Sequence, residues 1–250
     1  MTEQRGRVRV EPGPKRVRVY LAGEVVADTL HPLLVWEGPH FPAYYLPRDD
    51  VRAEALTSSD RTEHSPSRGD ARYFHVTRGD TVAEDAAWEY PDSPLEELRG
   101  HLRFEWDAMG AWFEEDEEVF VHPRDPYSRV DILASSRHVE VDVGGVRVAD
   151  THHPTLLFET GLPTRYYLPK VDVRMDRLRP TPTESACPYK GFAQYWSVVT
   201  PDGVVDDVAW GYRTPLPESQ KIAGLVCFYN ERVDLTVDGE ALARPHTKFS

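Results

Sequence analysis

The densest group of chemically reactive side chains lies between Cys187 and Trp196, in the segment Cys-Pro-Tyr-Lys-Gly-Phe-Ala-Gln-Tyr-Trp. It holds a thiol, two phenols, an ammonium and an indole around Gly191, which permits a tight turn. A neighbouring ammonium lowers the pKa of a thiol and makes it a better nucleophile. Cys187 and Lys190 are therefore candidate catalytic residues, and Glu159 is a candidate proton carrier.

The same segment also suits ligand binding without catalysis. Arg165 precedes a Tyr-Tyr pair, and a guanidinium can bind a carboxylate or phosphate through two hydrogen bonds. Ligand sites are mostly apolar and aromatic, with a few polar groups that fix orientation. We therefore expect Arg165 and Lys190 to receive an anionic group of a small molecule. The other expected ligand-contacting residues are Tyr167, Tyr189, Tyr195 and Trp196.

A long internal repeat determines which elements position these residues. Shifting the chain by 122 residues places Tyr44–Pro47 on Tyr166–Pro169 and Trp88 on Trp210 without a gap. This spacing is far above the 20 to 50 residues of stacked repeats, so it indicates duplicated domains. After Tyr90 the alignment shifts by two residues. The expected organisation is a first copy over residues 7–121, a linker over 122–128 and a second copy over 129–250.

The two copies differ at the reactive positions. The counterpart of the Cys187 segment is Ser65–Phe74, which keeps its Pro, Gly and Ala and has Tyr73 in place of Tyr195, but lacks the thiol, the Tyr189 phenol and the lysine. Ala43 stands where the second copy has Arg165. This asymmetry suggests one working site, in the second copy, although two different ligands would give the same pattern.

Each candidate also has a structural interpretation. A single cysteine is more often buried and unreactive than catalytic, and Cys227 lies in an apolar run typical of a core. Arg165 could pair with Glu159 or Asp172 instead of a ligand. Glu159 has a mate in the first copy, Glu37, and a residue kept in both copies favours a structural hydrogen bond. His152-His153 lacks further spaced ligands, so no metal site is expected.

Alternating valines around positive-φ turns predict that each copy opens with a β-hairpin, at Ala22-Gly23 and at Gly144-Gly145. Short apolar runs bounded by proline predict further strands. Helical periodicity is weak, and the best helix candidates are one short stretch per copy, around 95–102 and 218–225. The sequence therefore predicts two mainly β domains of the sandwich or barrel type.

Composition narrows the possible partners. The net charge of -13 would repel a phosphate backbone, which argues against nucleic-acid or membrane-surface binding. The chain has no apolar run long enough to span a membrane. The start, Met1 to Val10, lacks the apolar core of a secretory signal, and the two cysteines suggest no disulfide framework, so we expect a cytoplasmic location.

The run from Glu159 through Arg165-Tyr166-Tyr167-Leu168-Pro169, Cys187-Pro188-Tyr189-Lys190-Gly191 and Ala209-Trp210 resembles the bacterial domain-of-unknown-function family numbered 427. The likeness covers nearly the whole chain and indicates the tandem two-copy form. It implies two β-tent-like domains, a fold shared by methionine sulfoxide reductase B and the thalidomide-binding domain of cereblon. Those relatives have a Cys-x-x-Cys zinc site, which Cys187 and Cys227 cannot form. The nucleotidyltransferase-like label sometimes given to the family finds no glycine-rich phosphate loop or paired-Asp motif here.

The leading hypothesis is a small-molecule-binding protein without a cofactor, whose main pocket lies in the second copy. One alternative is an enzyme that uses Cys187 as a nucleophile or redox thiol. Another is a partner-binding scaffold. The oligomeric state is open.

Overall fold

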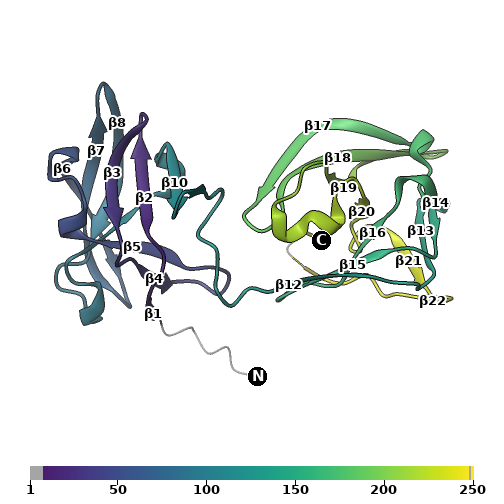
Figure 1. Ribbon diagram of the computed structural model, residues 1–250, viewed down its shortest axis with the longest axis horizontal. Coiled ribbons are helices and arrows are strands. Elements are labelled where there is room, and N and C mark those ends of the chain that lie inside the picture. The colour runs from purple at the N-terminus through teal and green to yellow at the C-terminus, as the bar shows by residue number, and fades with distance from the viewer. Residues whose placement is uncertain (1–7, 248) are drawn as a thin grey trace. The chain divides into compact units, whose positions relative to one another are not determined.

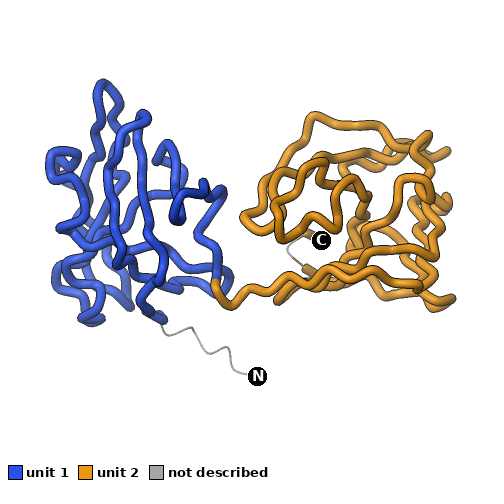
Figure 2. Tube along the Cα trace, in the orientation of Figure 1, with its two compact units in different colours: residues 1–125 blue, residues 126–250 orange. Residues whose placement is uncertain are grey.

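The computed structural model describes residues 8–247 and 249–250. The chain divides into two compact units, residues 1–125 and residues 126–250 (Figure 2). The expected start of the first copy, at residue 7, lies outside the described residues. None of the described helical segments has the length and apolarity needed to cross a bilayer.

The first unit contains one seven-stranded and one four-stranded antiparallel sheet (Figure 1). In spatial order, the larger sheet is β1 (Arg9–Pro12), β4 (Leu33–Trp36), β5 (Ala43–Pro47), β9 (His101–Phe104), β8 (Thr81–Glu89), β7 (Gly69–Arg78) and β6 (Leu56–Ser65). The smaller sheet is β11 (Glu117–Glu118), β10 (Ala111–Glu114), β2 (Val17–Leu21) and β3 (Glu24–Thr29).

The second unit repeats this topology strand for strand. Its larger sheet is β12 (Val130–Ala134), β15 (Thr155–Glu159), β16 (Arg165–Leu168), β20 (Val226–Phe228), β19 (Gly203–Tyr212), β18 (Gly191–Thr200) and β17 (Leu178–Cys187). Its smaller sheet is β14 (Val146–Thr151), β13 (Val139–Val143), β21 (Asp234–Val237) and β22 (Glu240–Ala241). The expectation of two tandem, mainly β domains is therefore confirmed.

Strand pairing also confirms the register of the repeat. Leu46 of β5 pairs with Leu102 of β9, and Leu168 of β16 pairs with Val226 of β20. Leu46 and Leu168 are 122 residues apart, whereas Leu102 and Val226 are 124 apart. The two extra residues of the second copy therefore lie before β20.

Helical structure in the described chain consists of short 3-10 turns. They are η1 (Arg48–Asp50), η2 (Ala53–Ala55), η3 (Glu96–Leu98), η4 (Trp106–Ala108), η5 (Lys170–Asp172), η6 (Met175–Arg177) and η7 (Pro217–Ile222). The helices expected at 95–102 and 218–225 are longer than the 3-10 turns found there, which cover Glu96–Leu98 and Pro217–Ile222. His101 and Leu102 belong to β9, because pairing along β5 satisfies more backbone groups than one further helical turn.

Each larger sheet buries side chains on both faces. One face packs against the smaller sheet and forms the main core, which in the second unit includes Val141, Leu168 and Phe228. The opposite face, called here the outer face, carries a second apolar cluster. In the second unit this cluster includes Tyr167 and Trp210, and Ile222 of η7 packs on it. Because the outer face is partly covered by its own turns, it can hold a site without exposing a large apolar surface.

Candidate functional site

Alternation along the strands brings most of the predicted residues to the outer face of the second unit. Tyr195 pairs with Trp210, and Cys227 pairs with both Trp210 and Tyr167. Paired residues of antiparallel strands share a face, as do residues two apart on one strand. Arg165, two residues before Tyr167, therefore also lies on this face.

Lys190 does not offer a free charge to a ligand. Its Nζ donates a hydrogen bond to Glu159 Oε2, and both side chains are about 10% exposed. The residue lies in the turn between β17 and β18, and its carbonyl accepts a hydrogen bond from Leu216 N–H at 3.1 Å. A buried ammonium is held by the carboxylate that neutralises it. The pair therefore fastens the turn to β15.

The first copy contains the same kind of pair. Glu37, the mate of Glu159, accepts hydrogen bonds from Arg103 and from the Tyr45 hydroxyl. Arg68, the mate of Lys190, lies 3.3 Å from the Glu37 carboxylate. A glutamate held by a cation at the same position in both copies supports a structural role for Glu159.

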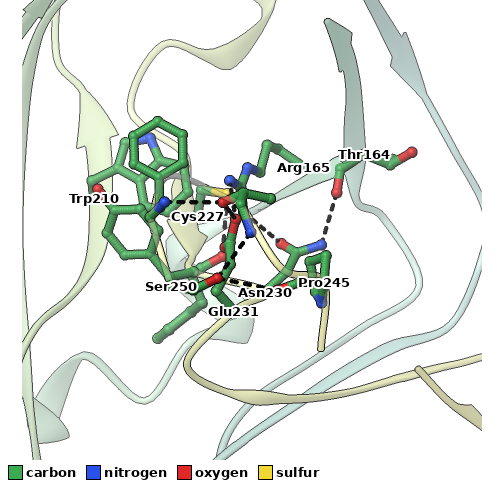
Figure 3. A network of polar contacts seen from close by, with 12 residues as sticks. Thr164, Arg165, Trp210, Cys227, Asn230, Glu231, Pro245 and Ser250 are labelled. Carbon is green, nitrogen blue, oxygen red and sulfur yellow. Dashed lines mark hydrogen bonds and ion pairs between the residues drawn. The ribbon is translucent and has the colours of Figure 1, made fainter. Parts of the chain in front are cut away.

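Arg165 forms a buried ion pair that the sequence did not predict (Figure 3). Its Nη1 and Nη2 donate to Glu231 Oε2 at 2.7 Å and Oε1 at 2.8 Å, and the Glu231 side chain is 0% exposed. Asn230 accepts a further bond from Arg165 Nη1 at 3.3 Å and donates to the Thr164 carbonyl at 2.9 Å. Burial alone would raise the pKa of Glu231, but hydrogen bonds from Arg165 and Thr247 hold it below its usual value. The ion-pair partner of Arg165 is thus Glu231 and not Glu159 or Asp172.

Three aromatic rings surround this guanidinium. The Arg165 Cζ atom lies 5.5 Å from the ring centroid of Trp210, 5.9 Å from that of Tyr229 and 5.6 Å from that of Phe249. Cation–π attraction adds to the ion pair at such distances. In the first copy Arg103 lies 4.7 Å from the ring of Trp88, the mate of Trp210. Both copies thus place an arginine over the equivalent tryptophan. The arginine comes from β9 in the first copy and from β16 in the second, and these strands are not equivalent.

The aromatic residues predicted to contact a ligand lie on two different faces of the larger sheet and differ in how deeply they are buried. Tyr167 is 1% exposed, and its hydroxyl accepts a bond from Trp210 Nε1 at 3.2 Å. Tyr195 is half-buried on the outer face, with its hydroxyl 2.8 Å from Ser185 Oγ. Trp196 packs against the main core instead. The prediction that it shares a wall with Tyr195 is wrong, because consecutive strand residues point to opposite faces.

Tyr189 and Cys187 lie in and beside the turn that holds Lys190. Tyr189 is half-buried, and its carbonyl accepts a bond from Ser219 Oγ at 2.9 Å. Cys187 ends β17 as a half-buried free thiol. The Lys190 ammonium expected to activate it donates to Glu159, so the geometry shows no thiol–ammonium pair.

The second unit has a concavity that none of the predicted site residues lines. Its volume is about 260 Å³. Its lining residues are Pro163, Thr164, Tyr166, Asn230, Leu235, Leu242, Ala243 and Pro245. Tyr166 is 7% exposed, and its hydroxyl has no hydrogen-bond partner in the described part of the chain. Burial raises the pKa of Tyr166, so the hydroxyl keeps its proton and remains a donor.

The equivalent tyrosine of the first copy is satisfied internally. The Tyr44 hydroxyl donates to Glu114 Oε1 at 2.6 Å. Glu114 pairs with Val17 just as Val237 pairs with Val139, so a valine replaces this acceptor in the second copy. The Tyr166 hydroxyl without an internal acceptor is therefore one of the specific differences between the two units.

Among the described residues, one group brings three metal-ligand types close together. Side-chain atoms of His138, Glu140 and Asp150 lie within 4.8 Å of one another. Arg147 donates to Glu140 and lies 3.7 Å from Asp150, so a cation already compensates these carboxylates. His138 Nε2 lies 2.8 Å from Asp150 Oδ1, where the first copy has an arginine–aspartate pair. The cluster is explained as a cross-strand ion network.

Sequence reasoning missed Tyr166, Tyr229, Glu231 and Phe249. Tyr166 was used only as a marker of the repeat. Glu231 follows the last strand of the larger sheet, in a stretch where the two copies no longer match. Nothing in the local sequence marked it, although it is one of the few buried acidic side chains among the described residues.

Comparison with known proteins gives one family. A profile described as "Domain of unknown function (DUF427)" matches residues 9–115 and again residues 131–239. No curated protein sequence matches the chain.

Proposed function

The chain belongs to the DUF427 family as a tandem two-copy member, and on this premise we propose that its second copy binds a small uncharged molecule in the Tyr166 concavity. The observation that carries the proposal is the hydroxyl of Tyr166, a residue that lines the concavity and whose side chain forms no hydrogen bond within the described chain. The hydroxyl is not one of the fully buried atoms of the described chain that lack a partner, so it is accessible from the concavity and can donate to an acceptor on a ligand.

The chemistry of the walls selects a neutral ligand. The described lining residues carry no charged side chain, and apart from Thr164, Tyr166 and Asn230 they are apolar. The cations first expected to bind an anion are neutralised by Glu231 and Glu159. A volume of about 260 Å³ is slightly below the range of roughly 300–1,000 Å³ found for drug-sized ligands. The ligand is therefore a small, largely apolar molecule with one hydrogen-bond acceptor.

Ligand-observed NMR with a matched series of rings tests this proposal. Cyclohexanone offers one carbonyl acceptor, whereas cyclohexanecarboxylate and cyclohexylammonium have the same ring with a charge. We expect the ketone to bind most tightly, because a charge cannot be compensated in this lining. Tyr166→Phe should weaken ketone binding about 3- to 10-fold, the value of one net hydrogen bond.

Tyr44→Phe, which removes the matching hydroxyl from the first copy, is the control and should leave ketone binding unchanged. Tyr166→Phe should not lower the melting temperature, because the hydroxyl has no partner to lose. Equal binding of all three rings, or ketone binding indifferent to Tyr166→Phe, contradicts the proposal.

A further inference from the structure

The described residues that follow β22 border the Tyr166 concavity at one end and contact the Arg165–Glu231 pair at the other. Figure 3 shows Pro245 and Ser250 close to that pair. Leu242, Ala243 and Pro245 contribute one wall of the concavity. The segment begins from β22, where Leu242 N–H donates to the Leu235 carbonyl at 2.8 Å. Its position therefore decides whether the concavity is closed on that side.

Thr247 and Phe249 connect the described far part of this segment to the outer face of the second unit. Thr247 Oγ1 donates to Glu231 Oε1 at 2.6 Å. The ring of Phe249 lies 5.9 Å from that of Tyr229 and 5.6 Å from the Arg165 guanidinium. Both contacts end on the same buried ion pair and its aromatic surroundings.

Between β22 and these contacts, the segment makes little buried contact. Leu242, Ala243, Arg244 and His246 are exposed, and Pro245 is half-buried. Arg244 forms only an exposed ion pair with Asp234, at 2.7 Å. Segments with few buried apolar contacts open locally at a small fraction of the global free energy of unfolding. Release of the two contacts should thus free the segment while the sheets stay folded.

We propose that residues 242–247 and 249–250 form a strap that opens and closes the Tyr166 concavity and is latched by Thr247 and Phe249 onto the Arg165–Glu231 pair. The ligand enters when the latch releases, and it is enclosed when the latch reforms. The proposal rests on the proposed function of the concavity, but latching can be measured without any ligand.

Tryptic cleavage after Lys248 reports latching in the full chain. The sequence places this bond between the two latch residues, and Arg244 is followed by proline, which prevents cleavage there. The ratio of the cleavage rate in a free peptide of residues 240–250 to that in the protein gives a protection factor. Using the peptide with the same substitution as each variant removes any effect on the protease itself.

We expect the unmodified chain to be protected and Thr247→Val to lower the protection factor about tenfold. A hydrogen bond to a charged group is worth roughly the energy of such a change. Arg244→Ala, the control in the same segment, should leave the factor unchanged because its exposed pair is not part of the latch. A protection factor near one in the unmodified chain overturns the strap, as does the same factor in Thr247→Val.

Cyclohexanone as probe separates the strap from the proposed function. A ligand enclosed by the strap should raise the protection factor at saturating ketone. Ketone binding with no change in protection overturns the strap and leaves the binding site intact. A tenfold fall in Thr247→Val without any ketone binding supports the latch and overturns the proposed function.

Discussion

Removing one partner of the Arg165–Glu231 pair should destabilise the second unit strongly. The two side chains are 5% and 0% exposed and share two hydrogen bonds of 2.7 and 2.8 Å. Glu231→Gln leaves a buried guanidinium that cannot lose its proton, and breaking a buried pair in this way costs about 3–5 kcal/mol. For a unit the size of residues 126–250, this is a fall in Tm of about 10–20 °C.

Differential scanning calorimetry of the full chain is the measurement. Arg165→Met/Glu231→Leu should recover most of the loss, because an apolar pair of similar size avoids the desolvation of both charges. Arg244→Ala, which breaks the exposed pair with Asp234, should cost less than about 1 kcal/mol. If Glu231→Gln lowers the free energy of unfolding no more than Arg244→Ala does, the Arg165–Glu231 pair does not stabilise the unit. The pair then cannot be the fixed point that holds Thr247 and Phe249.

Three further predictions concern pH, the thiols and one glycine. Because the pKa of Glu231 is lowered in the folded state, the stabilisation by this carboxylate should be complete above its unfolded pKa of about 4.3 and be lost as pH falls through the folded pKa. Glu231→Gln should therefore flatten this part of a curve of Tm against pH. An unchanged curve would contradict the assignment. Burial raises the pKa of Cys227 to about 12, so iodoacetamide should label half-buried Cys187 in the native chain and Cys227 only in denaturant, as checked by peptide mass spectrometry. A Cβ at Gly211 would lie 2.4 Å from the Leu225 carbonyl oxygen, so Gly211→Ala should destabilise by about 1–3 kcal/mol in chemical unfolding; a neutral effect would show that the backbone there can yield.

The alternation of side chains along β-strands explains why part of the candidate site could be predicted from the sequence. This alternation is local, so placing Arg165 and Tyr195 on one face of the sheet needed only the strands and their order. The same rule, applied strictly, would have excluded Trp196, since it follows Tyr195 directly. The error came from grouping residues by proximity in sequence rather than by face.

The sequence by itself determined the duplication, its register and the β architecture. The positive φ angles of Gly23, Gly144 and Gly145 in the hairpin turns are set by residue type and local sterics. Because the two copies share their sequence pattern, the strand order of one copy is expected in the other. These features depend on interactions between neighbours in the chain or on identical residues at matching positions.

Only the tertiary structure decided which charges meet. Arg165 and Glu231 are 66 residues apart, and Lys190 and Glu159 are 31 apart, so neither pairing follows from local pattern. Each depends on how a turn or a strand end folds back over the outer face. The same holds for the Tyr166 hydroxyl: its neighbours in sequence match those of Tyr44 closely, but the distant exchange of Glu114 for Val237 removes its acceptor and leaves it facing a concavity.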